Sequence, residues 1–187
     1  MPPRFKALYP RTRVVIDGTE IKTERPSKQK QRIHLWSNYK HAYTLKFLVG
    51  IAPSGEFTFL SKAFGGRATD TEITVRSGLV QLLEKNDRVM ADKGFPQIEE
   101  DVNNRGAFLI TPPLKSKAAG LIQFTAEESD RAYEVASVRI EVERAIERLK
   151  RFEILKFLHR DMVPLVDDIM TTLCLIANLQ GDLTKRK

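Results

Sequence analysis

Short apolar runs separated by turn-forming residues dominate the first part of the chain. β-Branched residues fill positions 14–16, and two later apolar runs flank the turn Pro53-Ser54-Gly55, which is the pattern of a β-hairpin. A fourth run ends at Asp92, and a fifth is stopped by Pro112-Pro113. The pattern therefore predicts strands at residues 13–21, 43–52, 56–64, 88–91 and 107–111.

Helical spacing is found between and after these strands. Thr69 or Asp70 can cap a helix that runs to about residue 84, and a polar helix is expected over residues 97–104. A more apolar helix is predicted over residues 162–179. The polar stretch 22–38 contains Pro26, which opposes regular structure, so a loop is expected there.

A long helix is predicted to begin at Thr125, which forms a capping box with Glu128. One apolar stripe at helical spacing runs along it, made of Val138, Val142, Ala145, Leu149 and Phe152. The order of strands and helices predicts an α/β protein with a mixed sheet flanked by helices, a layout similar to the RNase H-like fold.

Length and composition favour one domain in a chain of 187 residues, of which 42% are hydrophobic. We expect a tail at residues 1–12, a domain at 13–180 and a basic tail at 181–187. The single cysteine excludes disulfides within the chain and cysteine-based zinc sites. Cys174 lies in an apolar segment and is expected to be a buried hydrophobe.

No secretory signal or membrane span is expected, because the longest apolar candidate is interrupted by Asp167 and Asp168. An intracellular protein is the corresponding prediction. The net charge of +7, from 31 Lys and Arg against 24 Asp and Glu, favours a polyanionic partner without proving one.

A basic segment follows the first predicted strand. It includes Lys28, Lys30 and Arg32, and Trp36 comes shortly after. Such a segment could contact DNA phosphates and stack on bases. The alternative is a solvated loop whose tryptophan covers an edge of the core, and composition does not decide between the two.

Three acids stand in positions that can gather metal ions. Asp17 and Asp92 each end an apolar run, so their carboxylates converge if the two strands are neighbours. Glu143 lies about 100° round the helix from Val142, at the edge of the apolar stripe. Oxygen ligands favour Mg²⁺ or Mn²⁺, and two such ions would promote cleavage of a phosphodiester.

Each acid also has an ordinary explanation. Asp17-Gly18 and Asp92-Lys93-Gly94 are turn-forming sequences, and Glu143 can pair with Arg139 one helical turn earlier. Spacing alone does not choose between a metal site and these alternatives.

Several segments in this order resemble the nuclease domain of DDE transposases of the PIF/Harbinger-like group, from about Val14 to about Leu179. They are Ile16-Asp17-Gly18-Thr19-Glu20, Ala91-Asp92-Lys93-Gly94-Phe95, Val142-Glu143-Arg144-Ala145-Ile146-Glu147 with its continuation to residue 150, and the segments 37–40, 48–55 and 60–66. The resemblance implies an RNase H-like fold and metal-dependent cutting and joining of DNA.

By position, the resemblance identifies Asp17, Asp92 and Glu143 as the catalytic and metal-binding triad. Asp70 also matches a recurrent family position. It is interpreted as a helix cap or as a residue that supports the metal ligands, with direct contact to metal as a lesser alternative.

The glutamate helix resembles a related bacterial signature, Tyr-x2-Arg-x3-Glu-x6-Lys, at Arg139, Glu143 and Lys150, whereas Ala136 stands in the place of the tyrosine. The two cations lie on the same helix face as Glu143, so they could hold DNA phosphates beside the metal ions. The alternative is a solvated face of ion pairs.

The first strand begins close to residue 12, which predicts that sequence-specific DNA recognition comes from a separate or missing module. The resemblance further implies DNA as partner, a homo-oligomer, and the nucleus as location in a eukaryote. Two other hypotheses remain open: a domesticated protein that binds DNA or a partner without catalysis, and an inert product of a broken element.

Overall fold

The computed structural model describes residues 11–92, 94–111, 140 and 142–180. Within them seven strands form one sheet in the order β2-β3-β1-β6-β7, and β4 and β5 also pair with β3. The strands are β1 (Thr12–Lys22), β2 (Trp36–Ser37), β3 (Ala42–Ile51), β4 (Phe57–Leu60), β5 (Phe64–Gly65), β6 (Arg88–Met90) and β7 (Phe108–Ile110). β3 is antiparallel to its neighbours, whereas β6 runs parallel to β1 and β7.

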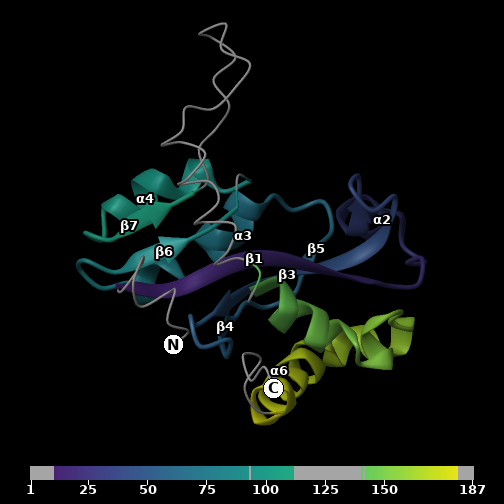
Figure 1. Cartoon of the computed structure of the whole chain (residues 1–187). Coiled ribbons are helices and arrows are strands. Elements are labelled where there is room, and N and C mark those ends of the chain that lie inside the picture. The colour runs from purple at the N-terminus through teal and green to yellow at the C-terminus, as the bar shows by residue number, and fades with distance from the viewer. Residues whose placement is uncertain (1–10, 93, 112–139, 141, 181–187) are drawn as a thin grey trace, which may run out of the picture.

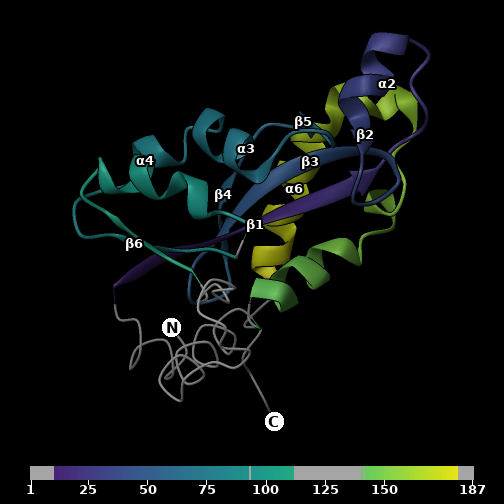
Figure 2. The same cartoon turned by 90° about the horizontal axis from the view of Figure 1, so that it is seen from above.

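Helices cover both faces of this sheet (Figures 1 and 2). The α-helices are α2 (Gln29–Leu35), α3 (Asp70–Arg76), α4 (Glu99–Asn103) and α6 (Val166–Leu179), and residues 142–150 are also helical. Short 3-10 turns are η1 (Val80–Leu82), η2 (Pro96–Ile98), η4 (Glu153–Leu155) and η5 (Arg160–Leu165). α3 and α4 lie on one face, while helix 142–150 and α6 lie on the other. The predicted α/β class with a mixed, helix-flanked sheet, consistent with the RNase H-like fold, is confirmed.

Alternation along β1 divides the core between the two faces. Val15 and Ile21 belong to the cluster under helix 142–150 and α6. Val14 and Ile16 belong to the cluster under α3 and α4. Because side chains two residues apart in a strand share a face, this alternation fixes the side on which each later polar residue of β1 lies.

The predicted strands 13–21, 43–52, 88–91 and 107–111 are present within one residue of their expected ends. The predicted strand 56–64 is instead two short strands, β4 and β5, both paired with β3. The Lys62 region between them leaves the sheet, and the backbone N–H of Ala63 donates to Asp167 Oδ1 at 2.8 Å. The prediction of one continuous strand was therefore wrong.

The predicted helix to residue 84 is too long. α3 ends at Arg76, because Gly78 adopts φ 85, a left-handed conformation that ends a helix, and only the short turn η1 follows. Thr69 is the N-cap, its hydroxyl accepting from Glu72 N at 3.1 Å, so the interpretation of Asp70 as a cap was wrong.

The stretch 22–38 is not a loop throughout, because it contains α2. This helix buries none of its residues and has no side-chain cap, so it lacks the apolar stripe and the cap by which a helix is recognised from sequence. Its start is stabilised instead by Arg32, whose guanidinium donates to Pro26 O and to Ser27 O at 2.8 Å each. Those bonds join Arg32 to carbonyls five and six residues earlier in the chain, and they are not part of the apolar pattern by which helices are predicted.

The stripe of the long helix is confirmed where it is described. Val142, Ala145 and Leu149 are buried, and Phe152 packs against the same cluster. Val138 and the proposed start at Thr125 lie outside the described residues.

The predicted C-terminal helix 162–179 ends where α6 ends, but α6 begins only at Val166, because residues 162–165 belong to the 3-10 turn η5. Cys174 is buried, as expected, and burial raises the pKa of its thiol to about 11. Among the described residues, the segment Arg160–Leu179 is long and apolar enough to be a candidate membrane span by length and composition alone, with mean hydropathy 1.5. The expectation that Asp167 and Asp168 would interrupt such a stretch was therefore wrong. Length and composition alone are weak evidence of a membrane span, because the core helix of a soluble protein meets the same criteria. One face of α6 is buried against the sheet.

Candidate functional site

Asp17 lies in the middle of β1, and Asp92 comes just after β6, the parallel neighbour of β1. Val15 of β1 is in register with Met90 of β6, and the extended run continues to Ala91, whose N–H donates to Ile110 O at 3.0 Å. Continued by two residues, this register sets Asp17 beside Asp92, on the face that Val15 and Met90 share. Both aspartates are partly buried. The sequence-based condition that these strands be neighbours is met.

Local hydrogen bonds help to fix the backbone around both aspartates. Gly18 N donates to Asp17 Oδ1 at 2.8 Å, which ties that carboxylate to its own backbone. The carbonyl of Asp92 accepts from Phe95 N at 3.1 Å, and Phe95 is buried in the core on the α3 and α4 side. The turn after Asp92 is therefore anchored by a large apolar side chain.

A third carboxylate, that of Asp70, lies on the opposite face of the sheet, next to this region. Asp70, at the start of α3, pairs with Lys46 Nζ of β3 at 2.9 Å, and Lys46 also donates to Ala68 O at 3.3 Å. Asp70 stands close to both glycines that follow the candidate acids. A Cβ on Gly18 would lie 2.8 Å from Asp70 Oδ1, and one on Gly94 would lie 3.5 Å from Oδ2.

The Lys46–Asp70 pair is well placed for a structural role. The Lys46 side chain is 13% exposed and that of Asp70 is 32% exposed, so water screens the pair only in part. Asp70 was recognised from the sequence, whereas Lys46 was missed. A lysine between Leu45 and Phe47, both buried in the same strand, is the signal that could have identified it.

Glu143 lies on an exposed flank of helix 142–150. Lys150, seven residues later, is on the same flank, because seven residues make nearly two turns. The opposite flank faces α6, where Arg148 donates to Ala177 O at 3.3 Å. Glu143 therefore lies on the side of the helix that faces away from α6.

The pKa of Lys150 indicates which charged groups lie near this lysine. Partial removal from water is the main cause that lowers the pKa of Lys150, and the charge of Lys40 adds to it. Asp17 and Glu20 of β1 act in the opposite direction and favour the charged ammonium. Lys150 is thus close to the part of β1 that bears Asp17 and Glu20.

The three acids suit a hard divalent cation in donor chemistry, since all their ligand atoms are oxygens. Among the described residues, however, no three Asp, Glu, His or Cys side chains lie close enough together to hold a metal ion. The strand pair brings Asp17 and Asp92 to neighbouring positions, but the described part of the chain does not gather the three acids into a formed metal site.

The other predicted DNA-binding residues differ in how accessible their charged groups are to DNA. Lys28 and Lys30 are exposed at the start of α2. Arg32 is partly buried, and its guanidinium is bonded to the carbonyls of Pro26 and Ser27, so its first role is structural. Arg139 lies outside the described residues.

Comparison with known proteins identifies the family. A family model described as DDE superfamily endonuclease matches residues 16–178, which is most of the chain and includes all three acids. No curated protein and no solved structure matches the chain. The match is to the superfamily, so the PIF/Harbinger-like group stays a prediction. With this match over an RNase H-like α/β fold, the chain belongs to the DDE superfamily endonucleases.

Proposed function

We propose that this chain is a metal-dependent DNA endonuclease with Asp17, Asp92 and Glu143 as its metal ligands, acting in a transposase or in a protein derived from one. The observation that supports the proposal is the parallel pairing of β1 with β6, whose register, continued two residues past Val15 and Met90, sets Asp17 beside Asp92 in the interior of the sheet. The family match supports the reaction class and DNA as substrate.

The chain's own groups have distinct tasks in this proposal. Asp17 and Asp92 hold Mg²⁺ or Mn²⁺ from the sheet, and Glu143 supplies a ligand from the helix. Two such ions, when bound, supply Lewis-acid activation of the phosphodiester and of the attacking oxygen. Lys150, which lies near Asp17, offers its side-chain nitrogen to an approaching DNA phosphate. Lys28, Lys30 and Arg139 contact the DNA backbone farther out.

Nicking of supercoiled plasmid by the purified chain tests the proposal. With Mg²⁺ or Mn²⁺ we expect nicking that EDTA abolishes. Asp17→Asn, Asp92→Asn and Glu143→Gln should each lower the rate roughly a hundredfold or more, because a lost ligand removes several kcal/mol of transition-state stabilisation. Nicking that survives Asp92→Asn in protein free of other nucleases would refute the assignment.

Two matched variants control for the loss of a charge alone. Asp168→Asn changes an exposed aspartate on α6. Glu147→Gln changes an exposed glutamate on the same helix as Glu143, where its partner is Arg151 at 3.7 Å. Both controls should nick at the wild-type rate, and urea unfolding should show that all five variants remain folded.

A non-catalytic DNA- or partner-binding protein on the same scaffold is the second candidate. One observation favours it: the described acids do not form a compact metal-binding group. Thermal unfolding with and without Mn²⁺ separates the two functions, because an ion that binds only the native state raises the unfolding temperature. A rise in wild type that Glu143→Gln loses supports the nuclease. No rise together with salt-dependent DNA binding supports the scaffold.

A further inference from the structure

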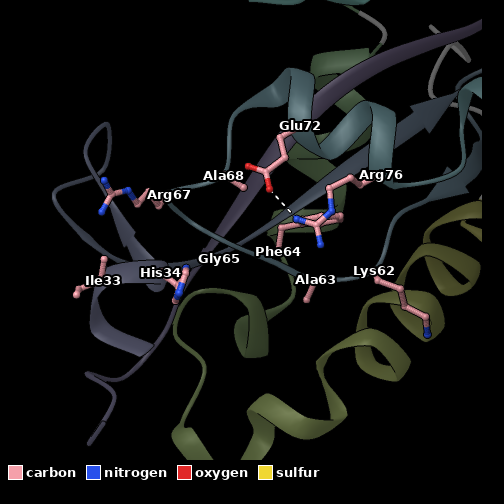
Figure 3. A pocket seen from close by; sticks show the side chains of 10 residues that line it. All are labelled: Ile33, His34, Lys62, Ala63, Phe64, Gly65, Arg67, Ala68, Glu72 and Arg76. Carbon is pink, nitrogen blue, oxygen red and sulfur yellow. Dashed lines mark hydrogen bonds and ion pairs between the residues drawn. The ribbon is translucent and has the colours of Figure 1, made fainter. Parts of the chain in front are cut away.

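A cavity of about 690 Å³ opens between α2, β5 and α3, apart from the three acids (Figure 3). Its wall carries the basic side chains His34, Lys62, Arg67 and Arg76, the aromatic ring of Phe64, and one acid, Glu72. A volume of this size is in the range of small-molecule sites and accommodates one nucleotide.

The charges that line the cavity do not cancel. Glu72 is committed to Arg76, with Oε1 2.7 Å from Nη1. Lys62 pairs with Asp167 at 3.5 Å, but its side chain is 83% exposed, so this pair is weak. Among the described residues no acid pairs with the Arg67 side chain. The cavity therefore presents net positive charge to a ligand.

The arrangement of these groups matches a nucleic acid strand. Figure 3 shows Arg67 and Lys62 at opposite sides of the opening, with Phe64 and Arg76 between them. The Arg76 guanidinium lies over the Phe64 ring, 5.5 Å from its centroid, and the two form a flat, partly apolar surface. Cations that flank a flat aromatic surface are the means by which proteins bind single-stranded nucleic acid.

The cavity is a built feature rather than a gap between mobile loops. Gly66 N donates to Thr44 O at 3.0 Å, and Arg67 N donates to His34 O at 3.1 Å, which joins α2 to the segment before α3. The packing is close: a Cβ on Gly65 would lie 2.3 Å from His34 O. The backbone that carries Arg67 is therefore held in place before any ligand binds.

Contacts connect the cavity to the middle of β1. Ala68, which lines the cavity, accepts the hydrogen bond from Lys46, and Lys46 pairs with Asp70 beside Gly18. The exposed Lys28 and Lys30 of α2 add positive charge to the same region of the molecule. A strand bound here would lie next to the structure that supports Asp17.

We propose that this cavity binds an unpaired segment of the DNA substrate, with phosphates at Arg67 and Lys62 and a base against Phe64 and Arg76. The inference rests on the proposed function only in taking DNA as the substrate. A concave site favours an unpaired strand over a regular duplex, because bases of a duplex are stacked and cannot enter it. A free mononucleotide shares this chemistry, and an acidic protein segment is the alternative partner.

The test is binding of fluorescent oligonucleotides in EDTA, where no cleavage occurs, measured by anisotropy over a series of salt concentrations. The variants are Arg67→Glu and Lys62→Glu. The matched control is Lys85→Glu, which reverses an exposed charge outside the cavity. Ligands are a single strand, a blunt duplex, a mononucleotide competitor and a poly-glutamate peptide.

We expect each cavity variant to bind the single strand about tenfold more weakly, because each removes one charge-assisted hydrogen bond to a phosphate. The slope of log affinity against log salt should become shallower by about 0.7 for each phosphate that the variant no longer neutralises. The blunt duplex should be affected less, Lys85→Glu should bind as wild type does, and Arg67→Lys should recover much of the affinity. A mononucleotide should compete far more weakly than the strand.

Several results would overturn the inference. The inference fails if the wild-type chain does not bind single strands, or if Arg67→Glu binds them with wild-type affinity. It also fails if the variants lose as much affinity for the duplex as for the single strand, or if a mononucleotide competes as well as the strand. Binding of the peptide through Arg67, without binding of DNA, would assign the cavity to an acidic protein segment instead. Nicking is measured separately. A chain that never nicks but binds single strands through Arg67 refutes the proposed function alone, and a nicking chain indifferent to Arg67→Glu refutes this inference alone.

Discussion

Replacing Gly18 by alanine tests whether the Lys46–Asp70 pair supports the middle of β1. The added Cβ would lie 2.8 Å from Asp70 Oδ1 and 3.5 Å from Lys46 Cε. The carboxylate oxygen must then retreat by roughly 0.7 Å to reach ordinary contact with carbon. That movement works against the 2.9 Å ion pair with Lys46.

Two opposing terms decide the sign of the effect. Disturbing a charge-assisted hydrogen bond costs about 1.5–3 kcal/mol, and the lower end applies because Asp70 is one-third exposed. Lys46 is only 13% exposed and cannot turn fully to water. Glycine-to-alanine replacement without backbone strain gains about 0.4–1 kcal/mol through the unfolded state. We expect Gly18→Ala to destabilise the fold by about 1 kcal/mol.

Urea unfolding midpoints measure this loss, with Gly94→Ala as the matched control. A Cβ on Gly94 would lie 3.5 Å from Asp70 Oδ2, an ordinary contact, so that variant should be close to neutral. The Gly18→Ala/Asp70→Ala double variant completes a thermodynamic cycle in which the added methyl no longer meets a carboxylate. Equal midpoints for the two glycine variants, or an undiminished loss in the Asp70→Ala background, would refute the reasoning.

Three further predictions concern other parts of the molecule. Folding lowers the pKa of Lys150, so just below pH 10.5 the native state holds fewer protons than the unfolded state. The free energy of unfolding should therefore rise with pH in that range, and Lys150→Met should flatten the rise in urea titrations. Cys174, with a pKa raised to about 11, should resist a thiol reagent at pH 8 until urea unfolds the chain; rapid labelling of native protein would contradict its burial. Asn178→Ala should cost about 1–3 kcal/mol, because Asn178 bonds both the N–H and the carbonyl of Phe57 on β4, and an exposed control, Gln180→Ala, should be neutral in the same urea assay.

The sheet could be predicted from sequence because its signals are local. Alternating and β-branched residues define β1, and a turn at Pro53 defines the start of β4. α2 could not be predicted, because its residues are unburied and its stability depends on Arg32 reaching carbonyls outside the helix. The end of α3 was missed for a different reason: Gly78 was available as a stop signal and was outweighed by the apolar residues after it.

The candidate site, too, could be predicted from the sequence only in part. The sequence predicted that Asp17 and Asp92 would converge if their strands were neighbours, but the condition itself is a long-range pairing that no local pattern contains. Lys46 is the clearer omission. The lysine could be seen within an apolar strand of the sequence. Its partner, Asp70, lies at the start of α3, and only the packing of α3 on the sheet brings the two side chains together.

Glu143 shows why a correct helix does not by itself give a correct metal site. Burial of Val142 and Leu149 fixes the rotation of helix 142–150 and so the flank on which Glu143 lies. The apolar pattern does not fix position along the helix axis, where one turn displaces a carboxylate by about 5.4 Å. Ligands of Mg²⁺ must lie within about 2.1 Å of the ion, so a fraction of a turn decides between a bound and an unbound glutamate. The fold and the positions of Asp17 and Asp92 therefore follow from apolar patterns that do not need this precision. Whether Glu143 completes the metal site depends on its position along the helix axis, which the apolar pattern does not fix.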